Sequence, residues 1–151
     1  MSQQNNFPED HSLGKSRPAR KEQIKKLLEK EPEDYYYVQI GNNQEIKIPV
    51  YKISISLAIY RLENRRTKSQ QKTYCSLNNL DFNFFSEDPE KREAIKIQHQ
   101  LLFKIASNDN KNHYELFKNG SYDSSMPMII NSDGILINGN TRMSALRQLY
   151  H

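Results

Sequence analysis

Cysteine is scarce in this sequence and long apolar runs are missing, and each absence excludes a class of protein. Cys75 is the only cysteine among the 151 residues, so neither an internal disulfide nor a cysteine-based zinc cluster can form. No segment approaches the roughly 20 apolar residues of a membrane-spanning helix, and the N-terminus lacks the apolar stretch of a secretory signal. We therefore expect a soluble, cytoplasmic protein with no membrane partner.

Metal-binding patterns are also missing from the sequence. The four histidines, His11, His99, His113 and His151, are scattered without the spacing of metal ligands. We expect each of them to be a surface or helix residue, with His99 on the flank of its helix. We expect Cys75 to be a bystander thiol. The sequence therefore predicts no metal site built from these residues.

What the chain does contain is enough apolar sequence for one core. Hydrophobic residues make up 36% of the chain and charged residues 26%, a balance that excludes wholesale disorder. A chain of this length corresponds to one domain, or to one domain with an appendage. The formal net charge of +4 favours an anionic partner only weakly, because the distribution of charge matters more than its sum.

The N-terminal third is predicted to hold a tail, a helix and a hairpin. Residues 1–18 are polar and lack periodicity, which predicts a flexible tail. Apolar residues then recur at helical spacing, which predicts a short amphipathic helix ending before Pro32. Two β-favouring runs, 35–40 and 45–51, flank Gly-Asn-Asn-Gln and predict a hairpin. Residues 19–44 thus form the helix and the start of the hairpin.

The middle of the chain is predicted to hold one loop and two helices. Residues 67–79 are rich in Gln, Lys, Asn and Ser, which predicts a mobile loop. Residues 89–106 follow helix-start signals and carry an apolar stripe at helical spacing. A second, shorter helix is predicted through residues 114–117, with Gly120 at its C-terminal end.

The C-terminal segment combines strand, turn and helix signals in a short space. Two apolar strand-like runs, 126–130 and 135–137, are joined by a turn at Asp133 and Gly134. Asn-Gly-Asn-Thr-Arg at 138–142 then leads into a predicted helix. This succession of strand, loop and helix is expected to direct backbone N–H groups and the side chain of an arginine toward one point.

The loop from Asn138 to Arg142 carries the predicted chemistry. Gly139 permits close backbone approach, and the free N–H groups at a helix start attract anions together with the helix dipole. Arg142 adds a planar fork of donors that matches phosphate oxygens. The pattern therefore predicts a phosphate site. In the alternative interpretation, Asn138 and Gly139 form a tight turn and Arg142 is a solvated surface charge.

The same segment resembles the C-terminal half of the ParB/sulfiredoxin-like domain, in which a Gly-x-x-Arg motif opens a helix after two short strands. The matching residues are Pro127, Met128, Ile129, Ile130, Asp133, Gly134, Ile137, Gly139, Asn140, Arg142, Ala145 and Leu146. Upstream, residues 48–67 are similar to the family's first strand and its arginine-bearing exit loop. Residues 89–106 fall where the family places its intervening helix.

The resemblance implies an α+β fold over residues 45–151, a small mixed sheet flanked by helices, with a nucleotide-phosphate cleft at the helix start. ParB-like partition proteins bind CTP in that cleft, sulfiredoxins bind ATP, and related free-serine kinases bind ATP or ADP. The implied cofactor is thus a nucleoside triphosphate, CTP or ATP, with Mg²⁺. The residues implied in nucleotide or phosphate binding are Asn138, Gly139, Asn140, Thr141, Arg142 and Arg66, with Arg65 as the alternative to Arg66.

Two departures from the family narrow the prediction. The chain reads Gly-Asn-Thr-Arg where sulfiredoxins place a catalytic cysteine, which excludes sulfiredoxin activity. Partition proteins continue into a DNA-reading helix-turn-helix domain, whereas this sequence stops at His151. We therefore expect a module truncated at its C-terminal helix, or a piece of a longer protein.

The leading hypothesis is a ParB-like nucleotide-binding module of bacterial type that acts in a DNA transaction such as partition, DNA modification or defence. Its DNA contacts would be weak, nonspecific and made to phosphates. The predicted DNA-binding residues are Arg61, Arg65, Arg66, Lys68 and Lys72. The alternative interpretation of this basic run is solvated charge.

Two other function classes stay open. The first is a ParB-like nuclease or nucleoside triphosphatase that uses Glu63 or Asp133 as its carboxylate. Against it, Asp133 is explained by its turn and Glu63 by pairing with a neighbouring arginine. The second is a regulator that binds a protein partner or forms a homodimer and whose cleft has lost its ligand.

Overall fold

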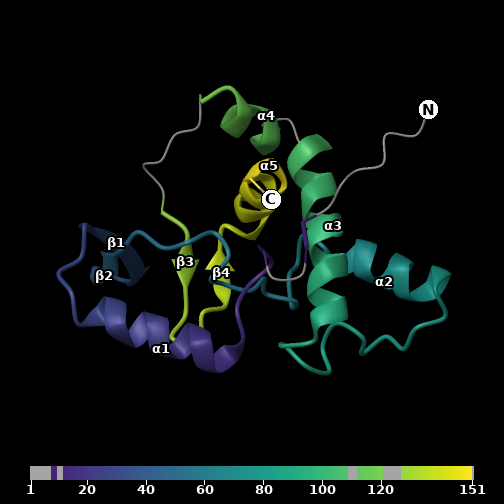
Figure 1. Ribbon diagram of the computed structural model, residues 1–151, viewed down its shortest axis with the longest axis horizontal. Coiled ribbons are helices and arrows are strands. Elements are labelled where there is room, and N and C mark those ends of the chain that lie inside the picture. Colours follow the sequence, from purple (N-terminus) through teal and green to yellow (C-terminus); the bar gives the residue numbers. More distant parts are fainter. Residues whose placement is uncertain (1–7, 10–11, 109–111, 121–126, 151) are drawn as a thin grey trace.

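The computed structural model describes residues 8–9, 12–108, 112–120 and 127–150 and has an α+β architecture (Figure 1). The helices are α1 (Arg17–Leu28), α2 (Lys68–Leu77), α3 (Arg92–Asn108), α4 (His113–Lys118) and α5 (Asn140–Tyr150). The strands are β1 (Asp34–Gly41), β2 (Gln44–Val50), β3 (Ile129–Ile130) and β4 (Leu136–Asn138). They form two small antiparallel sheets, β1–β2 and β3–β4. The predicted α+β class is confirmed at this level.

The predicted hairpin is present and lies beside α1 at one end of the molecule (Figure 1). Tyr36 pairs with Ile48, and Asn43 takes the left-handed conformation, with φ of 60°, in the connecting turn. Because side chains alternate along a strand, Tyr35 and Tyr37 lie on the opposite face from Tyr36, and both are exposed. The hairpin therefore buries little of its aromatic surface.

The tail prediction is wrong for residues 12–18, which pack against the body of the molecule. Leu13 is 1% exposed and belongs to the hydrophobic core. Gly14 has φ of 118°, and an added Cβ would lie 2.5 Å from Cγ2 of Ile59. A single buried leucine produces no periodicity, so the sequence pattern could not reveal this contact. The rest of the predicted tail, except residues 8 and 9, lies outside the described residues.

The core is centred on the segment that precedes Arg61. Ile59 forms a parallel bridge with Ile135. Its N–H donates to the Gly134 carbonyl at 3.0 Å, and its carbonyl accepts from the Leu136 N–H at 3.0 Å. This bridge places the segment beside the β3–β4 hairpin, whose turn at Asp133 and Gly134 has the predicted position. The strand pair, the bridge and α5 thus form one unit around the start of α5.

Helix α3 stands between α5 and α2, and α4 packs against both α3 and α5 (Figure 1). The predicted helices at 89–106 and 114–117 are therefore confirmed, with small shifts at their ends. His99, however, is 1% exposed and does not lie on the flank of α3. Its Nδ1 lies 2.7 Å from the Tyr60 hydroxyl, and its Nε2 lies 3.0 Å from Oε1 of Gln148. These polar partners explain why a histidine is tolerated in the core.

The predicted mobile loop at 67–79 is wrong, because this segment forms helix α2. Cys75 and Thr67 are buried at the inner face of the helix. The Nε2 group of Gln71 donates to the Leu62 carbonyl at 2.8 Å and to Oε1 of Gln98 at 2.9 Å. Hydrogen bonds from polar side chains therefore attach α2 to the Leu62 segment and to α3. The pattern of apolar residues alone could not predict this helix. Burial raises the pKa of the Cys75 thiol above its ordinary value.

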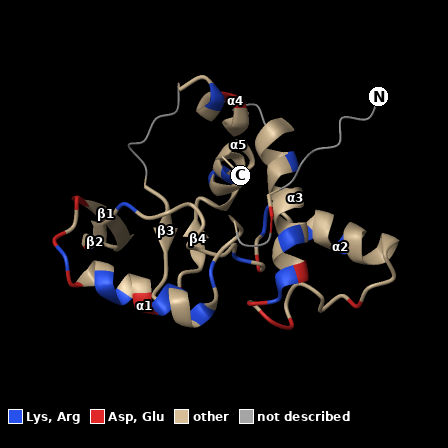
Figure 2. Ribbon diagram, in the orientation of Figure 1, with Lys and Arg blue, Asp and Glu red and all other residues tan. Residues whose placement is uncertain are grey.

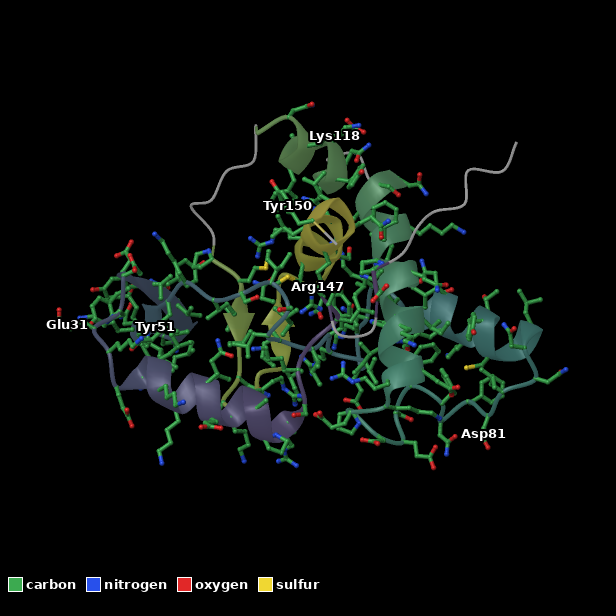
Figure 3. All side chains as sticks on the ribbon, in the orientation of Figure 1. Glu31, Tyr51, Asp81, Lys118, Arg147 and Tyr150 are labelled. Atoms are coloured by element: carbon green, nitrogen blue, oxygen red, sulfur yellow. The ribbon has the colours of Figure 1, made fainter. Side chains whose placement is uncertain are left out.

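Two arginines that add to the net charge are buried and serve the fold. Arg147 is a buried residue of α5 (Figure 3), and its Nε donates to the Ile55 carbonyl at 2.7 Å while its Nη2 donates to the Ala58 carbonyl. Arg20 donates to both carboxylate oxygens of Glu90, at 2.8 and 2.7 Å. Figure 2 shows the remaining Lys and Arg residues spread over several elements, including α1 and α3. Within the described residues, no helix has the length and apolar character needed to cross a membrane.

Candidate functional site

The turn from β4 into α5 requires glycine at position 139. Gly139 has φ of 99°, and an added Cβ would lie 2.6 Å from Cγ of Met128 and 3.2 Å from Nη2 of Arg142. The first backbone bond of α5 runs from the Met143 N–H to the Gly139 carbonyl at 2.8 Å. The N–H groups of the first helical turn have no acceptor within a helix. The loop thus presents them beside the Arg142 guanidinium.

Asn140 fixes the start of α5 to the rest of the core. Its Oδ1 accepts from the Arg61 N–H at 2.9 Å, and its Nδ2 donates to the Leu136 carbonyl at 3.0 Å. The side chain is almost fully buried. The sequence predicts that Asn140 lines the phosphate loop, and the structure shows that its side chain also holds that loop in place.

Arg66 joins this loop from a segment far away in the sequence. Its Nη1 lies 3.3 Å from Oγ1 of Thr141. Its backbone N–H donates to Oδ1 of Asn64 at 2.9 Å, so a tight turn sets the direction of the arginine. The sequence left Arg66 and Arg65 as alternatives for this position, and Arg66 is the one that reaches the loop.

These residues enclose a cavity of about 210 Å³, which we name the α5 pocket. It is lined by Asn64, Arg66, His113, Ile137, Asn138, Gly139, Asn140, Thr141 and Arg142. The fold therefore brings together all six residues that the sequence predicts for nucleotide or phosphate binding. The sequence missed Asn64 and His113, because the tertiary fold alone carries α4 and the turn at Asn64 to the start of α5.

The charge and size of the α5 pocket suit an anion with several oxygens. Its lining includes Arg66, Arg142 and the start of α5, and none of the described residues that line it is an aspartate or glutamate. The positive end of a helix dipole adds to the attraction for an anion. Ligand cavities for drug-sized molecules have volumes of about 300–1,000 Å³. The α5 pocket is smaller and matches the phosphate part of a nucleotide better than a whole nucleotide.

A second cavity of about 450 Å³, which we name the α2 pocket, lies next to the first. It is lined by Arg61, Leu62, Glu63, Asn64, Arg65, Lys68, Gln71, Lys72, Cys75, Phe82, Phe85 and Ser86. The two pockets share Asn64. Four of the five cations predicted to contact DNA line this pocket, and Arg66 is the exception. The basic run is thus divided between two neighbouring cavities.

The two carboxylates considered for catalysis do not meet. Glu63 is exposed and lines the α2 pocket. Asp133 lies at the β3–β4 turn, where its Oδ1 is 3.6 Å from Nη2 of Arg17 and 3.6 Å from Nζ of Lys21. Among the described residues, no group of three histidine, cysteine, aspartate or glutamate side chains is placed to hold a metal ion. The arrangement therefore favours binding of an anion over two-carboxylate chemistry.

Comparison with protein-family models, with curated proteins and with solved structures gives no match to this chain.

Proposed function

We propose that this chain is a ParB/sulfiredoxin-like module that binds the phosphates of a nucleoside triphosphate, CTP or ATP, in the α5 pocket. The observation that carries the proposal is the 3.3 Å approach of Arg66 Nη1 to Thr141 Oγ1. This contact brings an arginine from the exit loop to the Gly139–Arg142 loop, although the two segments are 75 positions apart. The parallel bridge between Ile59 and Ile135, beside the antiparallel β3–β4 pair, supports the mixed sheet of this fold.

Each part of the pocket has a role in phosphate binding. The N–H groups at the start of α5 donate to phosphate oxygens, and Gly139 lets the phosphates approach the backbone. Arg66 and Arg142 supply charge and planar donor groups from two sides of the loop. His113, the first residue of α4, adds an imidazole side chain to the lining of the pocket.

The described residues of the α5 pocket do not fit a protein-held Mg²⁺ site, because none of them carries a carboxylate. Mg²⁺ typically keeps several waters and is held by one or two carboxylates together with substrate phosphates. In this proposal, Mg²⁺ would reach the pocket only as part of the nucleotide complex. Hydrolysis of the nucleotide has less support than binding, since Glu63 is the one carboxylate in the described lining of either pocket.

Calorimetric titration of the intact chain with CTP, ATP, GTP and UTP, each with and without Mg²⁺, tests the proposal. We expect at least CTP or ATP to bind, with tripolyphosphate as a competitor, because the phosphates supply most of the contacts. The opposite result, no heat from any of the four nucleotides at millimolar concentration, would leave the regulator with an empty cleft as the better hypothesis.

A further inference from the structure

The α2 pocket carries a net positive charge that the fold does not use. Among the described residues that line it, the cations are Arg61, Arg65, Lys68 and Lys72, and the one acid is Glu63. All four cations are exposed. Among the described residues, no ion pair joins any of the four to a carboxylate. This charge is therefore available to an anionic ligand.

Aromatic rings lie in the same pocket. Phe85 is buried and packs edge-to-face against Phe84, with ring centroids 5.0 Å apart. Phe82 is 77% exposed, although burying a phenylalanine ring away from water is energetically favourable. Cations that follow a backbone, together with exposed aromatic rings on which bases stack, are the features of proteins that bind single-stranded nucleic acid.

The positions of the cations fit a strand better than a single phosphate. Lys68 and Lys72 lie four residues apart on one face of α2, which separates their backbones by roughly 6 Å along the helix axis. This spacing is of the same order as that between neighbouring phosphates of an extended strand. Consecutive phosphates of one strand would supply several negative charges to these four cations.

The two pockets are neighbours, and Asn64 belongs to the lining of both. Arg65 lines the α2 pocket and Arg66 lines the α5 pocket, so adjacent residues serve different cavities. The turn between them is closed by the Arg66 N–H donating to Oδ1 of Asn64 and by the Thr67 N–H donating to the Asn64 carbonyl at 3.2 Å. The α2 pocket is therefore the neighbour of any ligand that fills the α5 pocket.

We propose that the two pockets together bind a single-stranded nucleic acid by its terminal phosphate. The terminal phosphate lies in the α5 pocket, and the following nucleotides lie along the α2 pocket with a base stacked on Phe82. This inference rests on the proposed phosphate site. It also revises the predicted duplex contacts, because paired and stacked bases inside a double helix cannot reach Phe82.

The charge of a terminal phosphate explains the choice of a strand end. A phosphate monoester carries a charge of about −1.5 to −2 at neutral pH, whereas a diester inside a strand carries only one negative charge. The α5 pocket combines Arg66, Arg142 and a helix start, with no acid among its described lining residues, so it favours the more highly charged group. Strand interiors are better matched by the separated cations of the α2 pocket.

Fluorescence anisotropy with short labelled oligonucleotides of mixed sequence tests this inference. DNA and RNA strands are each prepared with a 5′ phosphate, a 3′ phosphate or neither, and each is compared with the matching duplex. We expect at least one end phosphate to strengthen single-strand binding about 10-fold, and the duplex to bind more weakly than that strand. Equal affinity with and without every end phosphate, or stronger binding of the duplex, would overturn the inference.

Variants separate this inference from the phosphate site on which it rests. We expect Lys68→Gln with Lys72→Gln, and separately Phe82→Ser, to weaken oligonucleotide binding about 10-fold while nucleotide binding stays unchanged. Lys25→Gln with Lys104→Gln, at exposed positions outside both pockets, is the matched control. If nucleotides bind but these α2-pocket variants bind the oligonucleotide like the parent, the inference fails and the proposed function stands. If neither nucleotide nor end phosphate binds, the phosphate site itself fails.

A competition experiment tests whether the α2 pocket binds an acidic protein and not a nucleic acid. A polyglutamate peptide carries negative charge but no bases and no phosphates. We expect it to displace the oligonucleotide far less well than an unlabelled strand of equal charge. Equal displacement by the peptide would contradict the inference and would assign the α2 pocket to an acidic protein partner.

Discussion

The backbone N–H of Arg61 donates a hydrogen bond of 2.9 Å to the side-chain oxygen of Asn140. Arg61 lines the α2 pocket and Asn140 lines the α5 pocket, so this bond connects the walls of both cavities. Asn140 also donates to the Leu136 carbonyl in β4. One amide side chain therefore sets the position of the Gly139–Arg142 loop relative to the basic segment.

This relationship predicts a combined loss of stability and binding for Asn140→Ala. The substitution leaves a buried N–H and a buried carbonyl without their partner, which costs about 1–3 kcal/mol of unfolding free energy. Urea unfolding and nucleotide calorimetry on the same samples measure both effects. Ser144→Ala, which removes a hydroxyl that donates to the Thr141 carbonyl, is the comparison within α5. A stable Asn140→Ala variant with full affinity would contradict the positioning role.

Arg142→Ala should instead reduce affinity with little change in stability. Loss of a charge-assisted contact of about 1.5–3 kcal/mol weakens nucleotide binding roughly 10- to 150-fold. Arg142→Lys should recover only part of the affinity, because an ammonium keeps the charge and loses the planar fork. The measurements are calorimetric affinity and the thermal midpoint without ligand. Parent-like affinity in a folded Arg142→Ala protein would refute the site.

Arg65 and Arg66 form a matched pair of adjacent arginines. We expect Arg66→Ala to weaken nucleotide binding roughly 10-fold or more, because Arg66 reaches Thr141 in the α5 pocket. Arg65→Ala removes the same charge, but Arg65 lines the α2 pocket. Nucleotide affinity should therefore change less than about 2-fold. Parallel titrations at two salt concentrations distinguish a contact from a general charge effect. Equal losses for both variants would contradict the assignment of Arg66.

Gly139→Ala should be more harmful than alanine at another glycine with positive φ. At Gly139 the new Cβ would meet Met128 Cγ at 2.6 Å, whereas at Gly120, with φ of 68°, it would meet no atom within 4 Å from the described residues beyond its chain neighbours. We expect a loss of about 2–4 kcal/mol at Gly139, from strain and overpacking. For Gly120→Ala we expect about 1 kcal/mol from the backbone alone. Urea unfolding compares the two, and similar losses would argue against the close packing of the loop.

Tyr60 predicts a loss of stability at high pH. Burial raises its pKa from 10.0 to about 12, against the opposing effect of Arg147. The folded state therefore holds the phenolic proton more tightly than the unfolded state does. The contribution of this proton to the free energy of unfolding is intact below pH 10 and is lost as the pH rises toward 12. A shift of this size corresponds to about 2–3 kcal/mol. Unfolding curves across this range should fall less steeply with pH for Tyr60→Phe than for the parent protein.

The elements that the sequence predicted well depend on local signals. The turn at Asp133 and Gly134 and the helix start after Gly139 are written in consecutive residues, so their positions follow from turn and cap preferences. The hairpin is likewise predicted by two β-favouring runs and the short turn between them. These local elements include five of the six predicted phosphate-binding residues.

The elements that the sequence could not predict depend on distant contacts. Helix α2 is attached by Gln71 and Thr67, whose buried hydrogen bonds no apolar pattern records. His113 reaches the α5 pocket because α4 packs on α5, which is a property of the fold. Arg147 and Arg20 count as surface charge in a composition, yet both are buried against backbone carbonyls. Burial of a charged side chain can be predicted only when its hydrogen-bonding partners are known.

The position of Arg20 has a consequence for the smallest part of the chain that can fold alone. From α1, its guanidinium bonds both oxygens of Glu90, its Nε donates to the Asp133 carbonyl, and an added Cβ at Gly134 would touch its side chain. A fragment beginning at residue 45 would leave the Glu90 carboxylate without its guanidinium and would uncover the turn beside β4. We therefore expect the autonomous folding unit to start no later than the segment around Leu13, so limited proteolysis should yield no stable fragment that begins after α1.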